Sequence, residues 1–375
     1  MTSSLKLLLV AGARPNFMKI APVLRGIQAR HGTFNHVLVH TGQHYDEGMS
    51  DVFFRELEIP APDYHLSVGS GSHAQQTARI MTAFEPVLDT EKPDCVVVFG
   101  DVNSTLACSI VAKKSGYPVA HVEAGLRSGD MSMPEEVNRI VTDSITDYFF
   151  VTEESGLEHL RHEGKPDKKV FHVGHVMIDN LYFELERLER EPIVDSALQG
   201  SRPPARQFCV ATLHRPSNVD DKEILGGIMS AIGKIAETLP VIFPVHPRTR
   251  ANLQQFDIPV STQITLTKPL GYREFLRLWR DAALVLTDSG GLQEETTALG
   301  VPCVTIRENT ERPITLTAGS NMLVGCKPQA ILDGAKAMLN RYPTGRSEGR
   351  PALWDGRASD RILDILAREL RHLAS

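Results

Sequence analysis

The most informative stretch of the sequence is an apolar run that ends at two glycines and continues as a helical pattern. It reads LVLTDSGGLQEETTALG, with a turn at Asp288–Gly291 and the helical pattern from Leu292. The free backbone N–H groups at such a helix start, together with the helix dipole, form an anion site. Ser289 adds a hydroxyl donor, and Glu294 or Glu295 could accept hydrogen bonds from ribose hydroxyls. The stretch favours a nucleotide; the alternative is an ordinary capped helix with acidic residues in its first turn.

Three carboxylates lie at strand ends or loops in the first half of the chain. Asp101 follows the apolar run Cys95–Phe99, Glu123 ends the next apolar run, and Glu135 opens a helix four residues before Arg139. Carboxylates gathered at one sheet edge suit general acid and base catalysis. The alternatives are a helix N-cap for Asp101 and a well-capped helix with an i,i+4 ion pair for Glu135.

Two cations follow the first expected strand. Arg14 lies at the strand end and Lys19 one turn into the next helix, so both are directed at the same edge; the alternative is a solvated surface pair. A dinucleotide loop would need G-x-G-x-x-G here, and Gly12 is the one glycine present. The turn is therefore not built for the pyrophosphate of a dinucleotide.

Histidine and arginine also end two strands of the second half. These are His214 with Arg215 and His246 with Arg248. No His, Asp and Glu triple has the spacing of metal ligands, so the pattern favours contact with an anion over a metal site.

Strand-like and helix-like patterns alternate along the whole chain in two series. The apolar runs are continuous, as in parallel sheets covered on both faces. Polar Glu191–Arg206 carries three prolines, and we place a hinge just before it, near Val173–His175. We expect an α/β protein of two facing, doubly wound Rossmann-like domains, 1–173 and 174–375, with an interdomain cleft and a last helix, about 357–375, that packs back on the first domain. The expected strands are Leu5–Val10, His36–His40, Cys95–Phe99, Pro118–Val122, Tyr148–Val151, Phe208–Thr212, Val241–Val245, Ile264–Leu266, Leu284–Leu286 and Cys303–Ile306.

Composition excludes several classes of protein. The 375 residues fit two domains, and 42% hydrophobic with 23% charged residues is ordinary for a soluble globular protein. A net charge of −6 argues against general binding of nucleic acid or membrane surfaces, and no apolar run approaches the roughly 20 residues of a membrane span. The start shows no signal-peptide pattern, and the five cysteines lack zinc or redox spacing. We expect buried, reduced thiols in a cytoplasmic protein.

Seven motifs stand in a fixed order along the chain. They are GARP at 12–15 with Lys19, TGQH at 41–44, HVEAGLR at 121–127, PEE-x-NR at 134–139, HR at 214–215, DSGG-x-QEE at 288–295 and TERP at 310–313. From about Leu7 to the final helix, this order resembles the non-hydrolysing UDP-N-acetylglucosamine 2-epimerases.

The resemblance implies a GT-B fold, a homodimer without cofactor or metal, and an isomerase that interconverts UDP-N-acetylglucosamine and UDP-N-acetylmannosamine for cell-surface polysaccharide synthesis. It assigns catalysis to Asp101, Glu123, Glu135 and His214, and makes Gln43 and His44 a candidate regulatory pair. Within the substrate site, Arg14 and the Ser289 turn would contact the diphosphate, Glu295 the ribose and Phe275 the uracil. The expected substrate-binding residues are Arg14, Lys19, Arg139, His246, Phe275, Ser289, Gly290, Gly291, Glu295 and Arg312.

The chain departs from the family pattern at several positions. The family usually has Thr and Glu where this chain has Ala13 and Asn16, and Glu-Asn where it has Ser217-Asn218. The glutamines at 75 and 76 follow a Gly/Ser-rich loop of altered spacing. The exact sugar and activation by substrate therefore stay open.

The chemistry of the sugar explains why carboxylates are needed. C2 is not α to a carbonyl, so its proton leaves either after oxidation by a nicotinamide or by anti elimination of UDP to 2-acetamidoglucal, followed by re-addition. The missing dinucleotide loop disfavours the first route. The second needs a base at C2, cations for the departing diphosphate and an acid on the opposite face. The alternatives are a 2-epimerase of a related UDP-N-acetyl amino sugar, a GT-B glycosyltransferase, which needs a single base, and a non-catalytic sugar-nucleotide sensor.

Overall fold

The protein consists of two compact units in a computed structural model that describes residues 4–42, 58–191 and 203–373. Unit 1 comprises Met1–Asn180 and Ala352–Ser375, and unit 2 comprises Leu181–Pro351. The boundary lies after Asn180, later than the hinge expected near Val173–His175. Within the described ranges, no helix is long and apolar enough to cross a membrane.

Unit 1 is built on a parallel sheet of seven strands in the order β3-β2-β1-β4-β5-β6-β7. The order reverses between β1 and β4, and such a switch point is where doubly wound sheets bind ligands, at the carboxyl ends of the strands. The strands are β1 Leu5–Ala11, β2 Phe34–His40, β3 Tyr64–His65, β4 Cys95–Phe99, β5 Val119–Val122, β6 Tyr148–Val151 and β7 Val170–His172.

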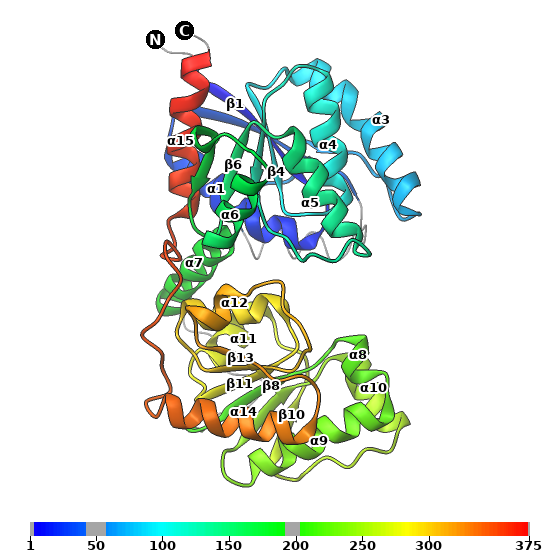
Figure 1. The fold of residues 1–375 in the computed structure, drawn as a ribbon, viewed down its shortest axis with the longest axis vertical. Helices are drawn as coiled ribbons and strands as arrows, with labels where there is room; N and C mark the ends of the chain where they lie inside the picture. The colour runs from blue at the N-terminus through cyan, green and yellow to red at the C-terminus, as the bar shows by residue number, and fades with distance from the viewer. Residues whose placement is uncertain (1–3, 43–57, 192–202, 374–375) are drawn as a thin grey trace. The chain divides into compact units, whose positions relative to one another are not determined.

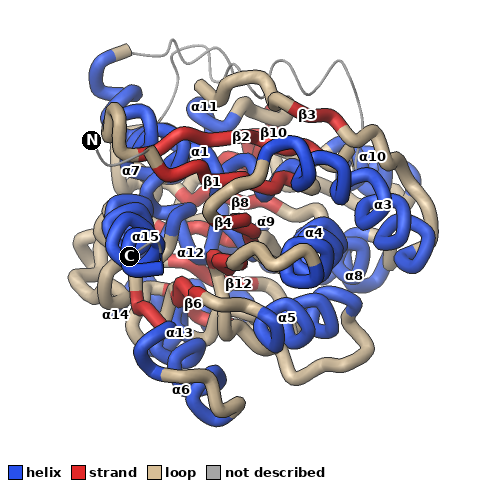
Figure 2. The backbone as a smooth tube through the Cα atoms, turned by 90° about the horizontal axis from the view of Figure 1, so that it is seen from above, coloured by secondary structure: helices blue, strands red, loops and turns tan. Residues whose placement is uncertain are grey.

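Helices cover both faces of this sheet (Figures 1 and 2). Along β1, Leu7 and Leu9 pack into one core with α1 and α15, whereas Leu8 and Val10 pack into the other with α3 and α4. Burial on both faces explains why the strands are continuous apolar runs. The helices of unit 1 are α1 Arg14–Ala29, α3 His73–Glu91, α4 Asn103–Lys114, α5 Pro134–Ile145, α6 Glu154–His162 and α15 Ala358–Leu373, and α7 Val176–Arg190 begins in unit 1.

Unit 2 repeats this plan with a parallel sheet of six strands in the order β10-β9-β8-β11-β12-β13. Its switch point lies between β8 and β11, and α9 and α14 pack together into its main core. The strands are β8 Cys209–Thr212, β9 Val241–Pro244, β10 Ile264–Thr267, β11 Leu284–Thr287, β12 Cys303–Thr305 and β13 Asn321–Leu323. The helices are α8 Pro216–Val219, α9 Lys222–Ala236, α10 Pro247–Gln255, α11 Tyr272–Trp279, α12 Gly290–Ala298, α13 Ile314–Thr317 and α14 Pro328–Arg341. The α/β class with two parallel, doubly wound sheets is confirmed.

Candidate active site

The turn between β1 and α1 is closed by Asn16. Its side-chain oxygen accepts hydrogen bonds from the N–H groups of Gly12 (3.2 Å) and Ala13 (2.9 Å), and its amide donates to the carbonyl of Phe99 at 2.9 Å. Asn16 therefore joins the ends of β1 and β4 across the switch point and uses donors that would otherwise face a ligand. Arg14, an expected phosphate contact, is the first residue of α1.

Asp101 lies just beyond β4 and pairs with Arg139 of α5. Its carboxylate accepts hydrogen bonds from the Nε (3.0 Å) and a terminal nitrogen (2.6 Å) of Arg139. The side-chain amide of Asn138 donates to the Asp101 carbonyl at 2.8 Å, which fixes the backbone as well. Because the Asp101 side chain is 29% exposed, this carboxylate is oriented by a cation and still open to a ligand.

The second partner of Arg139 is Glu136, a buried residue that the sequence did not single out. A terminal nitrogen of Arg139 donates to Glu136 at 2.7 Å, and the carboxylate also accepts from the N–H groups of Ser128 and Gly129, each at 2.9 Å. Burial opposes ionisation of Glu136, but these donors outweigh it and lower its pKa. Within the described part of the chain, Arg139 makes no ion pair with Glu135, so the expected i,i+4 pair is replaced by an i,i+3 pair.

Glu123 follows β5, and its side chain is 1% exposed. Lys19 of α1 forms an ion pair with one carboxylate oxygen, and Nε2 of His175 lies 3.9 Å from the other. A methyl group at Gly100 would come within 2.8 Å of the Lys19 amine, so the end of β4 packs directly against this pair. Glu123 has a left-handed backbone (φ 73°), and its N–H donates to the carbonyl of Phe150 at 3.0 Å. The backbone thus turns the side chain inward. Lys19, expected to bind substrate, contacts a catalytic candidate in the structure.

Asp143 of α5 supports the ends of β4 and β5, and sequence reasoning missed this residue. Its carboxylate contacts His121 Nδ1 at 2.7 Å, Arg127 at 2.8 Å and the N–H of Gly125 at 3.0 Å. His121 Nε2 lies 2.8 Å from the carbonyl of Gly100. Each ring nitrogen of His121 thus lies within hydrogen-bond distance of an oxygen, one on the Asp143 carboxylate and one on the Gly100 backbone. Burial raises the pKa of Asp143, but the charge of His121 and the other donors reverse this effect and lower it.

In unit 2, Asp288 joins the ends of β8 and β11. Its buried carboxylate accepts from the N–H groups of His214 (3.0 Å) and Arg215 (2.9 Å), the amide of Asn218 (3.3 Å) and Nδ1 of His214 (2.9 Å). Burial raises the pKa of Asp288, and these donors, led by His214, more than compensate and lower it. The His214 side chain stays 42% exposed, and its ring centroid lies 6.1 Å from that of His246 after β9. Two expected site residues are therefore together at one sheet edge.

The expected anion site at the start of α12 is present as a helix terminus. Ser289 is the N-cap with no side-chain cap bond, and the helix begins at Gly290. The first N–H groups of a helix have no partner within it. A methyl group at Gly290 would lie 3.9 Å from the guanidinium groups of both Arg215 and Arg307, so two cations flank this terminus. Burial, followed by the charge of Arg307, lowers the pKa of Arg215.

Glu295 is buried further along α12. The hydroxyl of Tyr272 in α11 donates a hydrogen bond to the Glu295 carboxylate at 2.7 Å. Phe275, the expected uracil neighbour, is also in α11 and is half-buried. Burial raises the pKa of Glu295 to about 7, although the Tyr272 hydrogen bond opposes this rise. Tyr272 carries no motif signal in the sequence. Arg312, expected to bind substrate, forms an ion pair with Glu294.

Two further expectations concern regulation and metals. Gln43 and His44 lie outside the described residues. In the ranges that the structure describes, no three His, Cys, Asp or Glu side chains gather to hold a metal ion.

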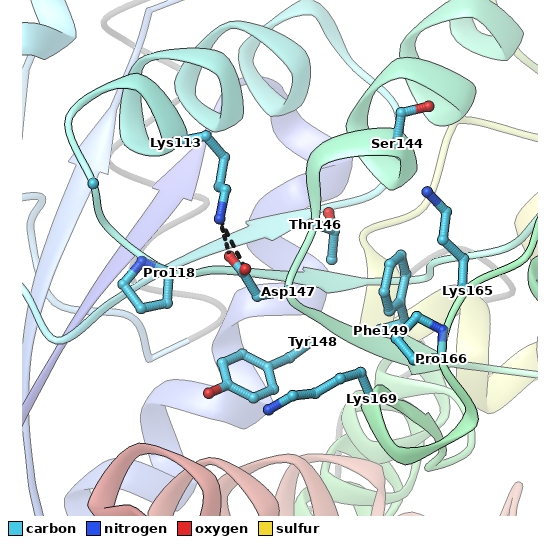
Figure 3. Close-up of a pocket in the computed structure, with 11 residues that line it drawn as sticks. Lys113, Pro118, Ser144, Thr146, Asp147, Tyr148, Phe149, Lys165, Pro166 and Lys169 are labelled. Atoms are coloured by element: carbon cyan, nitrogen blue, oxygen red, sulfur yellow. Dashed lines mark hydrogen bonds and ion pairs between the residues drawn. The ribbon is translucent and has the colours of Figure 1, made fainter. Parts of the chain in front are cut away.

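A hollow of about 550 Å³ in unit 1 lies at the opposite, amino-terminal edge of the sheet (Figure 3). Its cations already have partners. Lys113 donates to both carboxylate oxygens of Asp147 at 2.8 Å, Lys169 pairs with Glu369 at 3.2 Å, and Lys165 lies over an aromatic ring. None of the expected site residues lines the hollow, so the strand carboxyl ends remain the candidate active site.

Comparison with known proteins finds relatives that match almost the whole chain. A UDP-N-acetylglucosamine 2-epimerase of Methanocaldococcus jannaschii is 40% identical over 96% of this chain and 99% of its own length. A Pseudomonas aeruginosa UDP-2,3-diacetamido-2,3-dideoxy-D-glucuronate 2-epimerase is 41% identical over 97% of this chain and all of its own length.

Solved structures show the same likeness. One of a Methanocaldococcus jannaschii UDP-GlcNAc 2-epimerase with UDP-GlcNAc and UDP matches 97% of this chain and all of its own, with a TM-score of 0.81 and 40% identity. A kitacinnamycin glycotransferase, 11% identical, matches 98% of this chain and 99% of its own with a TM-score of 0.62, which shows a shared GT-B fold alone. Residues 27–367 match the family described as UDP-N-acetylglucosamine 2-epimerase. The chain therefore belongs to the UDP-N-acetylglucosamine 2-epimerase family.

Proposed function

We propose that the protein reversibly epimerises C2 of a UDP-N-acetylhexosamine, converting UDP-N-acetylglucosamine to UDP-N-acetylmannosamine. The observation that carries this proposal is the pair of carboxylates after the adjacent strands β4 and β5. Asp101 is joined to Arg139 and Glu123 to Lys19, so each carboxylate is held by a cation beside the switch point of unit 1.

The proposed reaction is an elimination followed by a re-addition. A carboxylate removes the C2 proton while the C1–O bond breaks, which gives 2-acetamidoglucal and UDP. A carboxyl group then delivers a proton to the other face of C2 as a diphosphate oxygen bonds again to C1. Asp101 and Glu123 are the proposed acid and base, with Glu135 as a third candidate. Groups of this kind each contribute about 10²–10⁴-fold to a rate.

The proposed nucleotide site lies in unit 2. The terminus of α12, flanked by Arg215 and Arg307, supplies donors and positive charge for the diphosphate. This charge also stabilises UDP as a leaving group. Glu295 would accept from the ribose, and the exposed His214 lies near the start of the same site.

Two alternatives differ in substrate or reaction. The Pseudomonas aeruginosa relative, named for a different UDP-amino sugar, keeps a 2-epimerase of such a sugar as the second candidate. A glycosyltransferase would need one base at its acceptor, and the two cation-held carboxylates favour an epimerase over it. We further propose a homodimer, to be tested by light scattering, in the reducing cytoplasm; five free cysteines are consistent with that compartment.

The test is epimerisation of a panel of UDP-N-acetylhexosamines in D₂O, followed at C2 by NMR without added NAD. We expect both epimers to gain deuterium at C2, because the proton is exchanged through carboxyl groups. Full retention of protium after epimerisation would contradict the elimination route and support hydride transfer instead. No epimerisation of any member of the panel would contradict the proposed activity itself.

A further inference from the structure

His175 lies in the segment between β7 and α7, and its side chain is fully buried. The ring of Trp354 meets it edge-on, with centroids 5.2 Å apart and planes at 80°. Trp354 is itself fixed, because its Nε1 donates to the carbonyl of Thr152 at 3.1 Å. The imidazole is therefore held in one orientation inside unit 1.

The hydrogen bonds of the ring determine where its proton lies. The N–H of Met177 donates to Nδ1 of His175 at 3.3 Å, so Nδ1 carries the lone pair and Nε2 carries the proton. Nε2 is 3.9 Å from a carboxylate oxygen of Glu123. This distance exceeds a hydrogen bond, and a side-chain shift of about 1 Å would close it.

The surroundings of Glu123 leave each oxygen facing a different group. Lys19 of α1 contacts one oxygen and Nε2 of His175 faces the other. A further charged neighbour is Asp179 of α7, which interacts electrostatically with His175. Because Glu123 is buried, an N–H group directed at its carboxylate from either side favours the charged form.

We propose that His175 is a positioning residue for Glu123. Nε2 of His175 orients the Glu123 carboxylate and keeps that carboxylate ionised for proton transfer. This proposal rests on the proposed epimerase function. It adds to the reaction a group that does not touch the sugar and acts through Nε2.

Two variants separate the two ring nitrogens. His175→Gln places an amide N–H near the position of Nε2, whereas His175→Asn keeps an acceptor for Met177 and lacks the donor toward Glu123. We expect His175→Gln to keep kcat within about threefold and His175→Asn to lose about tenfold, with KM and UDP affinity unchanged. A lost donor raises the pKa of Glu123, so the acidic limb of kcat/KM should move to higher pH by about 0.5–1 unit in His175→Asn.

The matched control is His172→Leu, a half-buried histidine of β7, which should leave the acidic limb in place. If His175 only fills space, both variants at 175 should be equally impaired, or His175→Asn should keep the wild-type pH profile; either result overturns the proposal. ¹³C NMR titration of the Glu123 carboxyl carbon gives a readout without turnover. A raised pKa in His175→Asn alone supports the contact even if the wild-type protein epimerises no sugar, in which case only the proposed function fails.

Discussion

At the residue scale, adjacent carboxylates of α5 have different environments. Glu136 is buried and accepts hydrogen bonds from three residues, Arg139, Ser128 and Gly129. Glu135 is half-buried and does not pair with Arg139. Glu136 therefore fixes the cation that holds Asp101, and Glu135 remains available to act on a substrate.

This difference predicts that a Glu→Gln substitution affects stability at position 136 and turnover at position 135. Glu136→Gln should destabilise unit 1 by on the order of 3 kcal/mol, because it leaves Arg139 with less charge to balance it in a buried pair. Glu135→Gln should change stability by less than about 0.5 kcal/mol and lower turnover by about 10²–10⁴-fold. Denaturant unfolding and steady-state rates measure the two effects. Equal loss of stability in both variants would contradict the separation of roles.

Glu295 predicts that nucleotide binding depends on pH. Its carboxyl has a pKa of about 7 in the free protein, so it is protonated below that pH. Ribose hydroxyls donate to the ionised form, so binding lowers the pKa and releases a proton. Affinity should therefore fall as pH drops below about 7, by up to about tenfold per unit.

Calorimetric titration with UDP-glucose measures this dependence, because its diphosphate does not titrate in this range. Glu295→Gln should bind more weakly and lose the pH dependence. Tyr272→Phe removes a hydrogen-bond donor to Glu295, so the midpoint should move to higher pH. If the wild-type affinity did not change between about pH 6 and about pH 8, one unit on either side of the midpoint, the ribose role would be contradicted.

The sequence identifies site residues at strand ends better than the contacts between them. Asp101 and Glu123 follow apolar runs, and parallel topology brings such ends to one edge. The pairing of Lys19 with Glu123 joins residues about a hundred positions apart, and no local periodicity encodes it. Tyr272 and Asp143 act through partners 23 and 22 positions away, beyond the reach of helix or strand periodicity, and were not foreseen.

At the element scale, Asp288 determines how β8 and β11 end together. Four donors from the β8 side converge on its buried carboxylate. The interaction holds His214 and Arg215 beside the terminus of α12. The turn is thus a support for the nucleotide site, and its aspartate does not itself face a phosphate.

Asp288→Asn should therefore weaken UDP binding without removing a nucleotide contact. The new amide places N–H groups against donors, and each unsatisfied buried group costs about 1–3 kcal/mol. We expect a lower melting temperature for unit 2 and roughly tenfold weaker UDP binding by calorimetry. Asp220→Asn, in an exposed ion pair with Arg248, should change either quantity by less than about 0.5 kcal/mol. Unchanged UDP affinity in Asp288→Asn would show that the turn does not support the site.

The central strands lie close to the ranges expected from the sequence, whereas three short edge strands were not expected. β11 spans Leu284–Thr287, one residue longer than the expected Leu284–Leu286. β3, β7 and β13 have only two or three residues each and are mostly half-buried or exposed, so they show neither a continuous apolar run nor a clear alternation.

At the scale of the whole molecule, unit 1 is built from two distant segments of the chain. After unit 2 ends at Pro351, the chain returns, and α15 packs beside α1 in the core of unit 1. Asp179 of α7 accepts from the N–H groups of Ala358 (3.0 Å) and Ser359 (2.6 Å) and so caps the start of α15. The stability of the first unit therefore depends on the last residues of the sequence.

Removal of residues 352–375 should unfold unit 1 and leave unit 2 folded. The deletion exposes the partners of Ile362, Leu363, Leu366 and Leu370, all of them buried in α15. Leu366→Ala is the milder change and should cost about 2–5 kcal/mol, because a buried leucine leaves a cavity. For Leu366→Ala, scanning calorimetry should show a lower melting temperature for unit 1 and an unchanged melting temperature for unit 2, since the two units have separate cores.

The control is Arg371→Ala, an exposed position on the same helix, which should leave both transitions in place. UDP titration of the truncated protein provides the second readout, because the nucleotide contacts proposed above lie in unit 2, apart from the expected contact of Arg14. Retained UDP binding together with lost epimerase activity would fit a nucleotide site in unit 2 and proton transfer in unit 1. If the truncation abolished both transitions, the two units would fold only together, and α15 would stabilise the molecule as a whole.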